Sequence, residues 1–219
     1  METHHSDNSF STANTATTSI HTSTFHPLLS IKFKMLFKTL VATVFAAASG
    51  LAAPLTARDD PFFAPSAIWQ YNVRNGAISS ATEGLVSKST SNNGNDITTL
   101  LTFTYPSEAE GKQCQFAFYL DDGATLTGSK KLDLFTSNSP APGPTSGWGP
   151  GNQRNIHLGR LSASLGSFAT WDATYNTYLT EKTDCKAAGT TEGFELVGVY
   201  DNDVVSWNPD VAGPRIIYT

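Results

Sequence analysis

The sequence predicts an all-β fold, a single antiparallel β-sandwich or jelly-roll-like domain that carries a long Pro/Gly-rich loop. Three observations favour this class. Apolar and polar residues alternate over several short segments, turn-forming residues separate those segments, and only 15% of the 219 residues are charged. No internal repeat and no long helical period compete with this interpretation.

The strands are expected between breaks of Gly, Pro, Asn and Asp. Alternation is clearest at 97–105, where Ile97, Thr99, Leu101, Phe103 and Tyr105 share one face, and at 113–120, where Cys114, Phe116, Phe118 and Leu120 share one. In chain order, extended segments are expected at 68–73, 77–86, 97–105, 113–120, 131–135, 156–165, 168–171, 193–200, 204–207 and 215–218. Asn93–Gly94 predicts a turn within a loop at 87–96, and 172–180 is the best place for a short helical turn.

The long loop is expected at 139–151, where eight of 13 positions are Pro or Gly. Trp148 lies within it, and an exposed Trp there would make a good contact for a protein or a glycan. The alternative is a Trp that folds back over the sandwich edge. The other tryptophans of the predicted domain lie in strand-like segments and are expected in the core: Trp69, Trp171 and Trp207.

The N-terminal region is expected to lie outside the folded domain. Residues 1–34 contain 13 Ser or Thr and predict a disordered extension, and 35–52 resembles a secretory signal peptide with cleavage after Ala52. Its apolar stretch is too short to span a membrane. The simplest explanation is that translation starts at Met35; a genuine extension that hides the signal and a core apolar helix are the alternatives. A leader at 53–66 and the β-sandwich at 67–219 would follow.

Cleavage would remove three Lys and two acidic residues, which leaves 167 residues with a net charge of −6. No basic face for nucleic acid is visible in so acidic a chain. Only one of the five His, His157, remains in the predicted domain, and no Cys or His pair has the spacing of a metal site. We therefore predict no metal and no cofactor.

Cys114 and Cys185 are the two cysteines of the chain. In a secreted protein they are expected to form one disulfide, with two free buried thiols as the alternative.

No catalytic residue is predicted. His157 would have to be the base of a Ser-His-Asp triad, but no Ser lies in a G-x-S-x-G motif. Several acidic residues could supply the two carboxylates of a glycosidase, although any acidic protein offers such pairs: Asp121, Asp122, Asp133, Glu195, Asp201 and Asp203.

Glu195 stands in an apolar run with Val197 and Val199 on its face. If that face is buried, the carboxylate needs a partner, for which Arg154, Arg160 and Arg215 are the candidates. A solvent-facing Glu and a catalytic acid are the alternatives.

Asp201 and Asp203 flank Asn202 between two predicted strands. The triplet lacks the glycine and the distal Glu of an EF-hand loop, so a polar turn is expected, with a weak calcium site as the alternative. Together with Trp148, these two carboxylates form the predicted binding surface.

Several motifs resemble one known family. The upstream stretches YPSEAEGKQCQFAFYL and KLDLF are followed by a Cys before a Gly-Thr turn, GFEL at 193–196, a strand ending at Trp207 and GPRI at 213–216. This pattern resembles the But-two C-terminal domain family, except that Cys185 is followed by Lys186 where the family usually has Pro. The resemblance implies a β-rich domain that is common as a secreted single-domain protein in fungi. The family's founding name implies an interaction with a ubiquitin-like-activating enzyme.

Three functions follow as hypotheses. The first is a secreted, non-enzymatic β-sandwich that binds a protein or glycan at or beyond the cell wall. The second is an intracellular interaction protein of a ubiquitin-like pathway, which requires the signal to fail and Cys114 and Cys185 to be reduced. The third is an extracellular glycan hydrolase, which requires a cleft that joins two carboxylates, one with a raised pKa.

Overall fold

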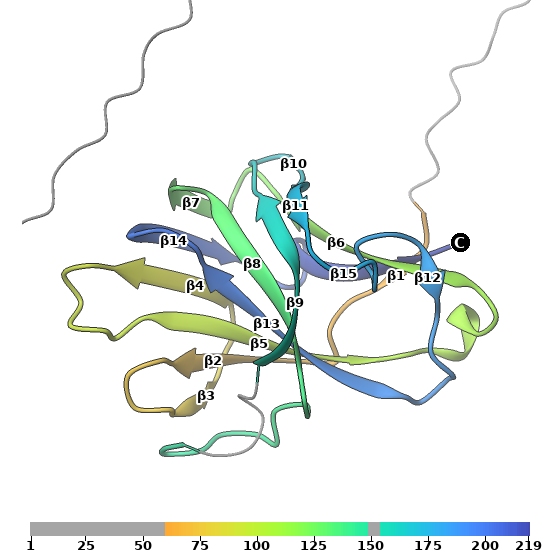
Figure 1. Ribbon diagram of the computed structural model, residues 1–219, viewed down its shortest axis with the longest axis horizontal. Helices are drawn as coiled ribbons and strands as arrows, with labels where there is room; N and C mark the ends of the chain where they lie inside the picture. The colour runs from red at the N-terminus through yellow and green to blue at the C-terminus, as the bar shows by residue number, and fades with distance from the viewer. Residues whose placement is uncertain (1–59, 149–153) are drawn as a thin grey trace, which may run out of the picture. The chain divides into compact units, whose positions relative to one another are not determined.

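The computed structural model describes residues 60–148 and 154–219, which form two antiparallel β-sheets (Figure 1). This confirms the predicted all-β sandwich. The only helix in these two stretches is the short 3-10 turn η1 (Ser107–Ala109), and no helix there is long and apolar enough to cross a membrane. The expected extension, the signal peptide, residues 53–59 of the leader and positions 149–151 of the Pro/Gly loop lie outside the described residues.

The described residues contain fifteen short strands, and the expected extended segments each correspond to one or two of them. They are β1 (Phe62–Phe63), β2 (Ala67–Asn72), β3 (Ile78–Ser80), β4 (Gly84–Ser89), β5 (Ile97–Thr104), β6 (Gln113–Leu120), β7 (Thr125–Gly128), β8 (Lys131–Ser137), β9 (Arg154–Ser162), β10 (Ser167–Phe168), β11 (Thr170–Thr174), β12 (Thr183–Asp184), β13 (Thr191–Gly198), β14 (Asn202–Trp207) and β15 (Gly213–Tyr218).

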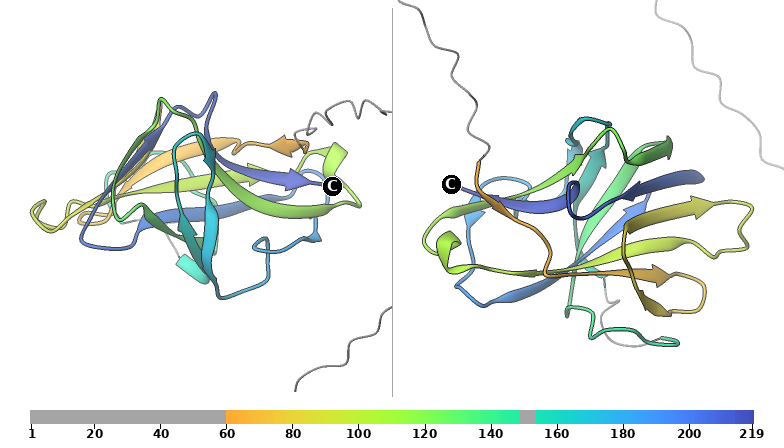
Figure 2. Two further views of the ribbon diagram at one scale, coloured as in Figure 1. Left: turned by 90° about the horizontal axis from the view of Figure 1, so that it is seen from above. Right: turned by 180° about the vertical axis from the view of Figure 1, so that it is seen from behind.

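The smaller sheet has five strands in the order β1-β15-β6-β10, with β12 also paired to β6. The larger sheet has ten strands in the order β11-β9-β8-β13-β5-β4-β14-β7, and β2 and β3 extend it beside β5. Figures 1 and 2 show β1 running along β15 at the edge of the smaller sheet.

Alternation of side chains along the strands builds the core between the sheets. On β6 the buried residues are Cys114, Phe116, Phe118 and Leu120, which share the face predicted for them. The larger sheet contributes Phe103, Leu134, Phe194 and Trp207 from β5, β8, β13 and β14. Each fully buried side chain of this size contributes about 1.5–3 kcal/mol of transfer free energy.

The predicted Cys114–Cys185 disulfide is confirmed. It joins the completely buried Cys114 on β6 to the residue that follows β12. The bridge thereby fixes the two-residue strand β12, which is too short to hold its place by its own ladder, against the smaller sheet.

A second, smaller apolar cluster lies on the outer face of the larger sheet. Tyr71, Ile78 and Leu100 form it, and the described part of the Pro/Gly loop packs against it through Ala141. Thr145 of this loop exchanges both backbone hydrogen bonds with Ile78. The loop segment before Trp148 is therefore tied to the sheet.

Several expected elements differ in the structure. No helix forms at 172–180, because β11 continues to Thr174 and pairs with β9. The expected helical turn is limited to 178–180, where Glu181 N–H donates to the Thr177 carbonyl at 3.2 Å. The expected strand at 168–171 is divided at Ala169, where the chain passes from the smaller sheet (β10) to the larger one (β11). The expected strand at 77–86 is likewise divided into β3 and β4. The two-residue strand β1 lies within the expected leader, and β7 and β12 were not predicted.

Candidate ligand-binding face

The outer face of the ten-stranded sheet carries the residues of greatest functional interest. Neighbouring strands follow the order β2, β5, β13, β8 and β9 across this face. The side chains that point away from the main core on these strands include a buried ion pair and exposed aromatic rings. Two pockets lie among them.

Glu195 on β13 is only 1% exposed, and Arg154 at the start of β9 neutralises it. Arg154 Nε donates to one carboxylate oxygen at 2.7 Å and Nη2 donates to the other at 2.8 Å. Thr98 Oγ1 on β5 donates to the second oxygen at 2.6 Å. The hydrogen bonds from Arg154 to Glu195 raise the pKa of Arg154 above its usual range. A buried carboxylate is tolerated because each of its oxygens has a donor.

The other two arginines considered for Glu195 have different partners. Arg160 forms a two-point pair with Asp133 at 2.8 and 3.1 Å, and this hydrogen bonding raises the pKa of Arg160. Arg215 belongs to the smaller sheet, where its guanidinium lies 4.3 Å from the ring centroid of Phe62 and 5.1 Å from that of Tyr119.

Trp148 is 71% exposed, the largest exposed fraction among the large apolar side chains that the structure describes. Its ring meets Tyr71 edge to face, with 6.3 Å between the centroids. The indole also packs closely on the backbone of Gly76. A Cβ atom at that position would lie only 2.6–2.8 Å from three indole atoms. Gly76 also has a φ of +73°, so a larger residue would be both strained and obstructed.

A pocket of about 280 Å³ opens at the base of Trp148, lined also by Tyr71, Val73 and Arg154. The Tyr71 hydroxyl is buried and has no hydrogen-bond partner among residues 60–148 and 154–219. Burial raises the pKa of Tyr71; the nearby Glu195 raises it further, whereas Arg154 opposes the shift.

A second pocket of about 140 Å³ adjoins the first, because Val73 and Arg154 line both. Its remaining walls come from β4, β5, β13 and the turn before β5: Ser87, Lys88, Asp96, Ile97, Thr98, Val197 and Gly198. The two pockets thus share a wall that Val73 and Arg154 form.

A row of planar groups continues from Arg154 across β8 and β9. The Arg154 guanidinium lies 5.3 Å from the Phe135 ring centroid, and Phe135 stacks on His157 at 4.3 Å with an interplanar angle of 18°. Tyr175 follows at 4.5 Å from His157 and is 56% exposed.

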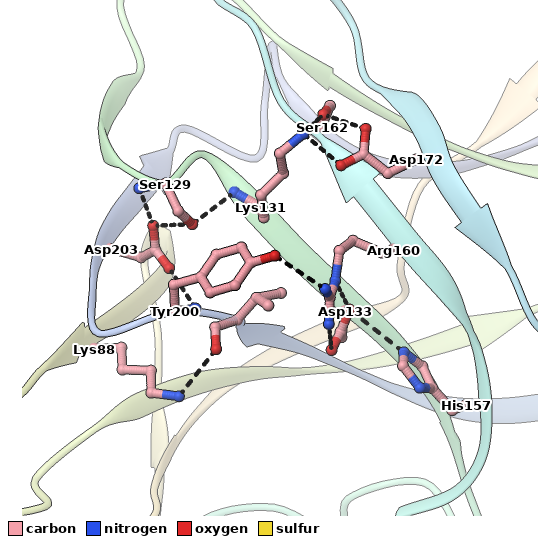
Figure 3. Close-up of polar contacts among 11 residues, drawn as sticks. Lys88, Ser129, Lys131, Asp133, His157, Arg160, Ser162, Asp172, Tyr200 and Asp203 are labelled. Carbon is pink, nitrogen blue, oxygen red and sulfur yellow. Dashed lines mark hydrogen bonds and ion pairs between the residues drawn. The ribbon is translucent and has the colours of Figure 1, made fainter. Parts of the chain in front are cut away.

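His157 lies beside Asp133 in Figure 3, with 3.4 Å between Nε2 and Oδ1 but no hydrogen bond between them. No Ser, Thr or Cys side chain in the described part of the chain hydrogen-bonds to this imidazole. His157 is therefore a strand residue packed on a polar face, and its surroundings lack the nucleophile that a triad base would activate.

Asp203 requires a correction, because it is not a surface carboxylate. It is 1% exposed, and its Oδ1 accepts from the backbone N–H and hydroxyl of Ser129, each at 2.6 Å, and from Lys130 N–H at 3.2 Å (Figure 3). It closes the turn between β7 and β8, in which Gly128 and Lys130 have positive φ. Asp201 is exposed and stays on the surface, so the two carboxylates do not act together.

Lys131 and Ser162 both hydrogen-bond to Asp172 at the far edge of the face (Figure 3). The hydrogen bond from Lys131 is the main cause that lowers the pKa of Asp172, and Ser162 adds to it. Among the described residues, no three His, Cys, Asp or Glu side chains converge to hold a metal ion.

Sequence reasoning predicted Trp148 as a binding residue and Arg154 as one of three candidate partners of Glu195, but it missed the residues that complete the face. Tyr71, Thr98 and Phe135 come from three separate strands, and only the strand order brings them together. Alternation could have placed Phe135 on an outward face, because the neighbouring Leu134 is a core residue. Tyr71 lies between Gln70 and Asn72, so alternation alone would have placed it in a core.

Searches of known protein families and of curated proteins found no match to the chain. The resemblance to the But-two C-terminal domain stays a prediction from its motifs.

Proposed function

We propose that this protein is a secreted, non-enzymatic β-sandwich that binds a protein or a glycan outside the cell, in association with the cell wall. The observation that carries the proposal is Trp148. Its large ring is 71% exposed, yet its orientation is fixed by Tyr71 and Gly76 above a pocket. Rigid, exposed aromatic side chains next to a concavity are enriched at recognition sites.

The disulfide supports the extracellular location. Cys114–Cys185 forms within the domain, and such bonds persist in oxidising compartments and are rare in the cytosol. The signal-like segment at 35–52 supports the same location. An interaction in a cytosolic ubiquitin-like pathway, which the family resemblance suggests, fits this chemistry less well.

The polar geometry gives less support to a glycan hydrolase. Glu195 is engaged by Arg154 and Thr98, and Asp133 is engaged by Arg160. A hydrolase needs two carboxyl groups that both face the substrate across a cleft, whereas these two are each held by a guanidinium group.

The first experiment is an intact-mass measurement, without reducing agent, on the culture medium and the cell extract of the source organism. We expect a species in the medium that starts near Ala53 and is two hydrogens lighter than the reduced chain. A full-length, reduced species confined to the extract would overturn the secreted location and favour the ubiquitin-like pathway.

The second experiment compares wild type, Trp148→Ala and Phe168→Ala for binding to the cell-wall fraction and to proteins of the medium. Phe168 is a matched control, because it is 47% exposed but lies on the smaller sheet. We expect only Trp148→Ala to lose binding. Equal binding by all three proteins would exclude Trp148 as the recognition residue.

A further inference from the structure

The two pockets beside Arg154 also indicate the chemical class of the ligand. We infer, building on the binding function proposed above, that this face binds a neutral glycan chain that runs from the Trp148 pocket past Arg154 into the pocket at Lys88. The inference rests on three features: one free aromatic face, a charge-balanced polar floor, and two adjoining pockets rather than one closed cavity.

The indole of Trp148 has one face available for a ligand. An added Cβ at Gly76 would be nearly equidistant from three atoms of the ring, so Gly76 lies beneath one face. The exposed area therefore belongs mainly to the opposite face. A flat, hydrogen-bearing apolar surface suits such a ring, and the C–H faces of pyranose sugars provide one.

The floor of the first pocket offers hydrogen bonds without net charge. Arg154 uses Nε and Nη2 for Glu195, while its Nη1 makes no hydrogen bond within the described residues, and the side chain is 39% exposed. Because Glu195 already cancels the positive charge, an anionic ligand would gain little attraction here. A neutral hydroxyl group can accept from Nη1 and leave the pair intact.

Tyr71 provides the second polar group. Its hydroxyl is buried beside this ion pair without a partner among the described residues, and an unpaired buried hydroxyl is unfavourable. A sugar hydroxyl that reaches the floor next to Arg154 would give Tyr71 its missing hydrogen bond. Hydroxyl groups both donate and accept, so one ligand oxygen can serve both residues.

The second pocket repeats this mixed character. Val73, Ile97 and Val197 contribute apolar surface to its lining, whereas Lys88 and Asp96 contribute opposite charges. Together the two volumes, 280 and 140 Å³, fall within the roughly 300–1,000 Å³ of small-ligand sites. Two adjoining pockets suit successive units of a chain better than one compact molecule.

The test measures retention of the purified, oxidised protein on a panel of neutral polysaccharides: β-1,3-glucan, β-1,4-glucan, chitin and mannan. Polygalacturonate and heparin serve as anionic comparators. We expect retention on at least one neutral polymer, with little change between about 0.05 and 0.5 M NaCl, because screening affects charged ligands and not neutral ones.

Two variants locate the site. Trp148→Ala should weaken binding at least about 30-fold, as expected for a central aromatic contact. Tyr71→Phe removes only the hydroxyl and should weaken binding about five-fold, the value of one neutral hydrogen bond, while its melting temperature stays at or above that of wild type. Phe168→Ala should bind like wild type.

The outcomes separate this inference from the broader proposal. Binding to a protein that depends on Trp148, without retention on any neutral polymer, overturns the glycan inference and leaves the proposed function standing. Retention only on the anionic polymers, with a steep loss in salt, also overturns it. Glycan binding that neither Trp148→Ala nor Tyr71→Phe weakens overturns the site. Absence of any Trp148-dependent binding overturns both proposals.

Discussion

Replacing Arg154 by Met would remove the guanidinium that neutralises Glu195. The carboxylate is 1% exposed and would keep a single side-chain donor, Thr98 Oγ1 at 2.6 Å. Breaking a buried ion pair on one side costs about 3–5 kcal/mol. Because Arg154 itself is 39% exposed and water can reach the vacated space, we expect the lower end, about 3 kcal/mol.

The measurement is urea unfolding of the oxidised protein at neutral pH, together with a thermal melt. For a domain of this size, about 3 kcal/mol corresponds to a fall of about 6–12 °C in Tm. Arg160→Met is the matched control. It breaks a pair of the same chemistry with Asp133, but the two side chains are 25% and 14% exposed, so the expected loss is below about 1 kcal/mol.

The double variant Arg154→Met with Glu195→Met tests the cause. An apolar replacement of both partners should return the stability to within about 1 kcal/mol of wild type, because no charge is left buried. The buried charge is not the cause if Arg154→Met loses no more free energy of unfolding than Arg160→Met. The same conclusion follows if the double variant is as unstable as Arg154→Met alone.

Three further predictions concern other parts of the fold. Replacing both Cys114 and Cys185 by Ser should reduce the free energy of unfolding by about 4 kcal/mol in urea, because the bridge closes a loop with a sequence separation of 71; a loss below about 1 kcal/mol would contradict this. Asp203→Asn should lose about 2 kcal/mol, since Asp203 accepts from the β7–β8 turn, whereas the exposed Asp201→Asn should change stability by less than about 0.5 kcal/mol; equal effects would refute the distinction. Burial raises the pKa values of Tyr71, Tyr105 and Tyr178, so the folded state keeps the protons of these hydroxyl groups. Their contribution to the free energy of unfolding is therefore complete below pH 10 and is lost as the pH rises above it. Absorbance at 295 nm should therefore show three tyrosinates that appear only with unfolding, and their appearance in the folded protein would refute the assignment.

The sequence predicted the strands that have an alternating pattern and missed those without one. β6 buries every second residue, whereas β5 is buried on both faces, with Leu101 in the main core and Leu100 in the outer cluster. The limits of both strands differ from the expected ones by at most one position. β1 and β12 have only two residues each, too few to show a period. β7 reads Thr-Leu-Thr-Gly and exists because β14 supplies an edge for it.

The candidate site was predictable only in part, because its contacts cross several strands. The apolar run around Glu195 indicated a cationic partner only if that face is buried, and the choice among Arg154, Arg160 and Arg215 depends on register. Asp203 illustrates the same limit. Its neighbour Asp201 points to solvent, and only the pairing of β14 with β7 places Asp203 under the turn at Ser129.

The Cys114–Cys185 bridge also determines how the domain would respond to mechanical tension. Because β1 lies antiparallel beside β15, a pull on the chain from these two strands would separate them one residue pair at a time, starting with Phe62 and Ile217. The bridge then limits the extension. The 71 positions that it spans, roughly 240 Å of stretched chain, stay closed until the sulfur–sulfur bond is reduced. Strands β6 to β12, which include the Arg154 side of the candidate binding face, are thus shielded from the applied force.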